Sequence, residues 1–222
     1  MAIRESFGVG EWYHCYNRGV DKRRVFESRR DYERFLQALY LCNSDEPIHQ
    51  NNLGKLSHQM ILAETRGSPL VSIGAYCLMP NHFHLVLQEI IENGITAFMQ
   101  KVGTAYTMYF NIKNERTGNL FLKPFRAKRI THDAYFKHIP NYVHLNPAEL
   151  FEPAWKRGIV KDVHELERKL RTYGYSSFPD FSGADRAERA ILDASTRELF
   201  EKNVDMSQLI EDATEYHNKM AL

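Results

Sequence analysis

Two histidines separated by a single residue, His82 and His84, lie in a β-prone run at residues 82–88. In a strand, side chains two residues apart point to the same face, so both imidazoles should project together while Phe83 faces the other way. Two neutral imidazoles on one rigid face can hold a divalent metal and leave positions open for a substrate oxygen. Such a pair also arises by chance with each ring satisfied by ordinary hydrogen bonds, so it needs further context.

A second candidate for chemistry is Tyr142, which is followed four residues later by Asn146. On a helix these two side chains would lie next to each other on one face. A tyrosine oxygen can act as a covalent nucleophile, but its reference pKa of about 10 requires an electrophile polarised by a cation. Asn146 offers an oxygen that could complete a metal site. The alternative is a core tyrosine and an asparagine that ends the helix before Pro147.

Basic and aromatic residues are mixed in the segment at residues 120–130, and a second basic cluster follows the residues at 11–17. Cations beside aromatic side chains suit a phosphate backbone with unstacked bases. A solvated strand edge would carry the same charges without binding anything. The candidate DNA-binding residues are Arg18, Lys123, Arg126, Lys128 and Arg129.

The overall charge gives no hint of such a partner. The chain has 222 residues with 29 Lys and Arg against 28 Asp and Glu, a formal net charge of +1. Residues 101–142, however, carry 8 positive and 2 negative charges, whereas residues from Phe181 onward carry 5 positive and 9 negative. In the net charge of the chain, the acidic residues of the tail therefore offset the basic residues at 101–142. We expect a chain shortened at about Phe181 to bind nucleic acid more tightly at low salt.

Composition excludes several classes of protein. Hydrophobic residues make up 43% and charged residues 26%, which is ordinary for a globular protein. There is no run of about 18 uncharged apolar residues, and the first residues lack the apolar core of a signal peptide. The three cysteines are far apart with no CxxC pair, which argues against a disulfide framework or a structural zinc site. We expect a cytoplasmic protein.

The elements that must position these side chains follow from hydrophobic periodicity and turn residues. Strands and helices in the order strand, helix, strand, strand, helix, strand, helix predict an α+β fold, a ferredoxin-like or RRM-like sandwich with a central antiparallel sheet. The expected strands are residues 11–17, 71–79, 82–88 and 120–130, with a hairpin at Pro80-Asn81, and the expected helices are 30–42, 94–114 and 133–145.

The domain organisation expected from the same pattern is a main domain at residues 1–180 and a helical C-terminal extension at 181–222. The main domain holds an insertion at 43–70, with a short helix near 57–64, and a loop at 173–178. The extension should form two helices, at 185–203 and 206–220. Asp185 and Glu188 resemble a capping box for the first of these helices.

Four motifs, in this order along the chain, resemble those of the HUH-type single-tyrosine transposases, in particular the REP-associated tyrosine transposase branch. The resemblance covers residues 11–178, and two motifs carry most of it: His-Phe-His within Tyr76–Leu87, and Asn-Tyr-Val-His-Leu-Asn-Pro at Asn141–Pro147. The other two are Tyr13–Gly19 and the Gly118–Phe121 run followed by Phe125-Arg126.

This resemblance implies a ferredoxin-like fold and a divalent metal, Mg²⁺ or Mn²⁺. It also implies cleavage and rejoining of single-stranded DNA with hairpin or palindromic repeats, through a 5′-phosphotyrosine that leaves a free 3′-hydroxyl. His82 and His84 match the metal ligands, Tyr142 the nucleophile and Asn146 a third, polar ligand. A homodimer is compatible with the resemblance.

Three departures from the family pattern and two other functions stay open. Pro140 should remove a helix hydrogen bond just before Tyr142, the excursion at residues 43–70 is longer than a minimal linker, and the extension after Phe181 lies outside the resemblance. A non-cleaving DNA- or RNA-binding module would use the same basic and aromatic surface without turnover. A metal-dependent phosphodiesterase that uses water would leave no bond between protein and DNA.

Overall fold

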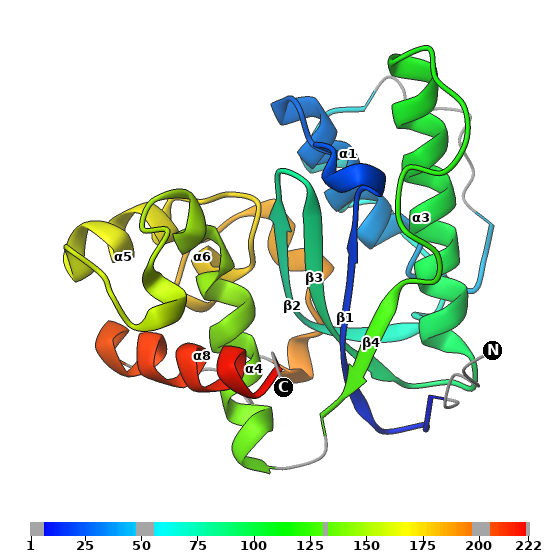
Figure 1. Cartoon of the computed structure of the whole chain (residues 1–222). Helices are drawn as coiled ribbons and strands as arrows, with labels where there is room; N and C mark the ends of the chain where they lie inside the picture. The colour runs from blue at the N-terminus through cyan, green and yellow to red at the C-terminus, as the bar shows by residue number, and fades with distance from the viewer. Residues whose placement is uncertain (1–6, 48–55, 131–132, 197–204, 221–222) are drawn as a thin grey trace.

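The computed structural model describes residues 7–47, 56–130, 133–196 and 205–220. Its centre is a four-stranded antiparallel sheet in the order β2-β3-β1-β4 (Figure 1). The strands are β1 (Trp12–Arg18), β2 (Val71–Met79), β3 (His82–Glu89) and β4 (Arg126–Arg129). This strand order, with a helix after β1 and another after β3, is that of a ferredoxin-like fold, and the predicted fold class is confirmed.

Helices cover both faces of the sheet, so each face is buried (Figure 1). One face packs against α1 (Arg29–Leu41) and α3 (Gly94–Lys113), and the opposite face packs against α4 (Asp133–Leu145). The short elements are η1 (Val20–Lys22), α2 (His58–Leu62), η3 (Asn146–Leu150), η4 (Trp155–Arg157), α5 (Val163–Arg171), α6 (Phe178–Phe181) and η5 (Ala187–Ile191). Within the described ranges, none of the helices combines the length and apolar character needed to cross a bilayer.

The β2–β3 hairpin forms where the sequence predicts it. Pro80 and Asn81 make the turn, and Met79 pairs with His82 at its base. β3 then lies between β2 and β1, with neighbours on both sides. A strand held by two neighbours fixes its side chains more firmly than an edge strand, because both sides of its backbone are hydrogen-bonded.

The predicted strand at residues 120–130 is wrong in its first half. β4 contains only Arg126–Arg129, and Phe121 makes a single bridge to Gly19. Between them, Leu122 donates its N–H to the carbonyl of Arg18, and the chain then leaves the sheet. Pro124 lies in this gap, and proline has no N–H to donate to a neighbouring strand.

The predicted helix at residues 185–203 is also wrong as far as residue 196, and residues 197–203 lie outside the described part. η5 is a short 3₁₀ turn, followed by an extended Leu192 and by helical residues that begin at 194. The expected capping box is absent because the N-cap is Arg186, which makes no side-chain cap bond, and Glu188 pairs with His58 at 3.2 Å. Tertiary contacts thus override the local helical pattern.

The predicted helix at residues 206–220 is confirmed as α8 (Met206–Met220), which lies beside α4 (Figure 1). Its buried side chains Leu209, Ile210 and Ala213 belong to the same hydrophobic cluster as Val143 of α4. A chain shortened at Phe181 would therefore lose part of its core, and its affinity for nucleic acid would not report the charge of the tail alone.

Candidate active site

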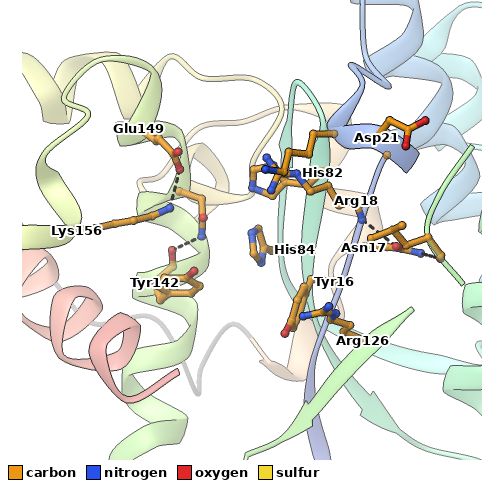
Figure 2. Close-up of a pocket in the computed structure, with 14 residues that line it drawn as sticks. Tyr16, Asn17, Arg18, Asp21, His82, His84, Arg126, Tyr142, Glu149 and Lys156 are labelled. Atoms are coloured by element: carbon orange, nitrogen blue, oxygen red, sulfur yellow. Dashed lines mark hydrogen bonds and ion pairs between the residues drawn. The ribbon is translucent and has the colours of Figure 1, made fainter. Parts of the chain in front are cut away.

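β3 presents His82 and His84 toward α4, as the alternation of side chains predicts. Val86 on the same face belongs to the cluster under α4, whereas Phe83 and Leu85 belong to the cluster under α1 and α3. The two imidazole centroids are 5.0 Å apart. Figure 2 shows His84 between the wall that carries Tyr142 and the wall that carries Tyr16.

The Nδ1 atoms of both histidines are occupied by hydrogen bonds within the protein. His82 Nδ1 lies 2.6 Å from Asn81 Oδ1, and because that oxygen can only accept, the imidazole donates. His84 Nδ1 lies 2.9 Å from His14 Nε2. Burial lowers the pKa of His82 to about 4 and the pKa of His84 well below its usual value. Both rings are therefore neutral at pH 7, as metal ligands must be.

Tyr142 lies on α4, facing the histidines, and α4 runs through Pro140 as one helix. Its ring centroid is 5.8 Å from that of His84, and the residue is 7% exposed. Burial, followed by the charge of Glu149, raises the pKa of its phenol to about 12. The phenol is protonated at neutral pH, so an attack by this oxygen requires a polarised electrophile and loss of the proton during the reaction.

Asn146 is the side chain that best fits the third position of a metal site. Its Nδ2 donates to the backbone carbonyl of Tyr142 at 2.7 Å, which fixes the carboxamide at the end of α4. Its Oδ1 is buried with no hydrogen-bond partner, although the side chain lines the pocket. A buried acceptor without a partner is costly, and a cation would satisfy it.

Acidic residues do not complete this site. Within the described ranges, no three residues of the types His, Cys, Asp and Glu are grouped so that they could hold a metal. The donor set that fits a divalent metal is therefore two imidazole nitrogens and one amide oxygen, from His82, His84 and Asn146. Imidazole and oxygen ligands of this kind suit Mn²⁺ and, through oxygen and water, Mg²⁺.

These side chains line a pocket of about 460 Å³ between α4 and the end of β1 (Figure 2). Arg18 and Arg126 come from the sheet side, opposite the wall formed by α4 and the segment after it. Lys22, from η1 after β1, also lines the pocket. The pocket thus combines the candidate nucleophile, the candidate metal ligands and several cations. Its polar lining residues are Tyr16, Asn17, Arg18, Asp21, Lys22, His82, His84, Arg126, Tyr142, Asn146, Glu149 and Lys156.

Only two of the five predicted DNA-binding residues, Arg18 and Arg126, line the pocket. Lys128 is exposed opposite His14 in the β1–β4 pairing, so it lies on the same face outside the pocket. Lys123 is exposed in the segment before β4. Arg129 lies on the opposite face and forms a 2.6 Å ion pair with Glu11.

Several residues of the site were not predicted. Glu149 and Lys156 line the pocket and form an ion pair at 2.6 Å, and Lys156 follows the main motifs by several residues. No spacing in the sequence marks either of them. Tyr16 and His14 could have been found, because residues of even number in β1 share one face and pair with β3.

Comparison with known proteins is informative at the level of fold. Neither protein-family profiles nor curated protein sequences match the chain. Among solved structures, it is similar to a REP-associated tyrosine transposase bound to a REP hairpin, at 16% sequence identity and a TM-score of 0.53. The alignment covers 92% of this chain and 99% of the other. The resemblance predicted from the motifs is thus confirmed at the level of fold: the chain has the fold of a REP-associated tyrosine transposase.

Proposed function

We propose that this protein is a metal-dependent transposase that cleaves and rejoins single-stranded DNA through a bond to Tyr142. The observation that carries the proposal is that Tyr142, His82, His84 and Asn146 line one pocket, although they come from distant parts of the sequence. Cations that suit a DNA backbone line the same pocket.

The cleavage step transfers a phosphoryl group from DNA to the protein. The Tyr142 oxygen forms a bond to phosphorus, and the bond from phosphorus to the 3′-oxygen of the preceding nucleotide breaks. The phenolic proton is released, and the departing 3′-oxygen gains a proton. The products are a 5′-phosphotyrosine and a free 3′-hydroxyl. Attack of a 3′-hydroxyl on the phosphotyrosine reverses these changes and rejoins a strand.

A divalent metal, Mg²⁺ or Mn²⁺, would be held by His82, His84 and Asn146 and would polarise the scissile phosphate. The neutral imidazoles and the unpartnered Asn146 oxygen support this assignment. Arg18 and Arg126 would bind the phosphates on either side of the bond to be cut. Positioning the phosphate against Tyr142 matters because the buried phenol is a weak nucleophile by itself.

The proposed substrate is single-stranded DNA that folds into a hairpin beside the cleaved bond. The solved transposase of the same fold is bound to a REP hairpin, which supports this choice. The test is to incubate the full chain with labelled hairpin-bearing single-stranded DNA and Mn²⁺, and then to separate products on a denaturing gel. We expect a covalent band that a chelator prevents.

Each alternative function gives a different result in this assay. A binding module would shift the DNA on a native gel but would produce neither cut ends nor a covalent band. A phosphodiesterase that uses water would produce cut ends without a covalent band. Either result would overturn the proposal.

The Glu149–Lys156 pair yields a prediction about affinity. Glu149→Gln should tighten binding of single-stranded DNA about fivefold at low salt, because it removes a negative charge from the pocket and frees Lys156 for a phosphate. The matched control is Glu165→Gln, which breaks an ion pair with Arg168 on α5, outside the pocket. The affinity is measured by fluorescence anisotropy. An equal gain in both variants would show that only net charge matters.

A further inference from the structure

A chain of three buried side chains connects the C-terminal helix to the histidine pair. Tyr216 on α8 has its hydroxyl 3.3 Å from His14 Nδ1, and His14 Nε2 lies 2.9 Å from His84 Nδ1. The three residues come from α8, β1 and β3 and are 5%, 1% and 7% exposed. Within the described residues, both nitrogens of His14 and Nδ1 of His84 thus have partners inside the protein, and the protons on these atoms are distributed among the three side chains.

The direction of these bonds decides whether His84 can bind a metal. If His84 Nδ1 carries the proton, it donates to His14 Nε2, and His84 Nε2 keeps its lone pair. His14 must then carry its own proton on Nδ1 and donate it to the Tyr216 oxygen. In the opposite direction Tyr216 donates, and the proton of His84 moves to Nε2, where it blocks a metal.

His84 differs in this respect from His82. The partner of His82 Nδ1 is the Asn81 oxygen, which accepts only, so its tautomer is fixed locally. The partner of His84 is another imidazole, which can donate or accept. The Tyr216 hydroxyl contacts His14 Nδ1 and is able to accept from it, so it supplies the acceptor that the metal-competent arrangement requires.

Tyr216 is itself held in place by the packing of α8 against α4. Asp212, one turn earlier on α8, accepts a hydrogen bond from Asn141 at 3.1 Å and pairs with His138 at 3.1 Å. The Tyr216 ring lies 5.0 Å from that of Tyr142. The contacts between α8 and α4 therefore fix the position of the Tyr216 hydroxyl beside His14.

We infer that His14 is a positioning residue for His84, and that Tyr216 fixes the tautomer of His14, so that the C-terminal helix is part of the candidate metal site. The inference rests on the proposed function for the identity of the metal. Without the Tyr216 hydroxyl, the metal-competent arrangement leaves a buried N–H of His14 without an acceptor. A buried donor without an acceptor is costly, so loss of the hydroxyl should disfavour the metal-competent arrangement.

The first test reads the tautomer directly, without metal or DNA. In full-length protein labelled with ¹⁵N-histidine, long-range ¹H–¹⁵N spectra report which nitrogen of His84 carries the proton. We expect the population with the proton on Nδ1 to fall in His14→Phe and in Tyr216→Phe. His14→Gln should restore it, because its side-chain oxygen can accept from Nδ1. Unchanged spectra in His14→Phe and Tyr216→Phe would overturn the inference.

The second test measures Mn²⁺ affinity by the EPR signal of the free ion. We expect about a tenfold loss in His14→Phe and a smaller loss in Tyr216→Phe, with recovery in His14→Gln. The matched control is Tyr173→Phe, which loses a part-buried hydroxyl bonded to the Leu78 carbonyl, outside the pocket. An equal loss of Mn²⁺ affinity in the control would indicate that removing any such hydroxyl destabilises the protein as a whole, and it would contradict the inference. If the variants show these effects but wild-type protein forms no covalent band with DNA, the proposed function fails and the inference stands.

Discussion

Tyr142→Phe should lower the yield of the covalent DNA adduct by at least about a thousandfold, because the oxygen proposed to form the phosphotyrosine bond is gone. Binding of the same hairpin DNA should stay within about twofold. The ring that packs against His84, His14 and Tyr216 is retained, and Arg18 and Arg126 are unchanged. The measurement is a denaturing gel for the adduct and fluorescence anisotropy for binding.

Two further measurements make this result specific. Peptide mapping of the wild-type adduct should place the nucleotide on the peptide that contains Tyr142. The matched control is Tyr173→Phe, which removes a part-buried hydroxyl away from the pocket and should keep the adduct. A persisting adduct in Tyr142→Phe, or a nucleotide mapped to Tyr16 or Tyr216, would assign the nucleophile elsewhere.

The double substitution His82→Ala with His84→Ala should have an effect of similar size on the metal-dependent reaction. We expect Mn²⁺-dependent cleavage to fall at least about a hundredfold, and Mn²⁺ binding to be lost, since Asn146 alone offers a single oxygen. Cleavage is followed with labelled DNA across a Mn²⁺ titration, and metal binding by EPR.

The control for this substitution is His164→Ala, an exposed histidine on α5. It should leave both the Mn²⁺ affinity and the cleavage rate unchanged. Thermal unfolding of the double variant separates loss of metal from loss of fold, because two small side chains at a buried position leave a cavity. If a well-folded double variant still cuts DNA at the wild-type rate in Mn²⁺, the histidines are not the metal ligands.

The central part of the fold was predictable because local patterns and tertiary structure agree there. Periods of two and of three to four residues gave the hairpin around Pro80-Asn81 and the helices α1, α3 and α4 within a residue or so. Prediction failed where long-range contacts determine the local secondary structure. The chain from Arg186 to Glu188 is held by Asp180 and His58 instead of by its own helix, and no local pattern reports such partners.

The candidate site shows the same division. His82 and His84 share a face because they are two apart on a strand, and Asn146 stays close to Tyr142 because they are one helical turn apart. Both distances are set by local geometry. Lys156 and Tyr216 reach the same region from segments whose course depends on packing against α4, so their spacing in the sequence carries no information about the pocket.

The packing of α8 against α4 bears on how many copies of the protein the proposed reaction needs. Both walls of the pocket belong to a single polypeptide, and α4 is anchored to its own chain through Asp212. Under the proposed function we therefore expect one copy to suffice, so the reaction velocity should rise in simple proportion to the amount of enzyme. A mixture of the Tyr142→Phe protein with the double-histidine variant should stay inactive. Each variant lacks part of the site, and the missing side chain cannot be supplied by a second copy if the whole site lies within one chain.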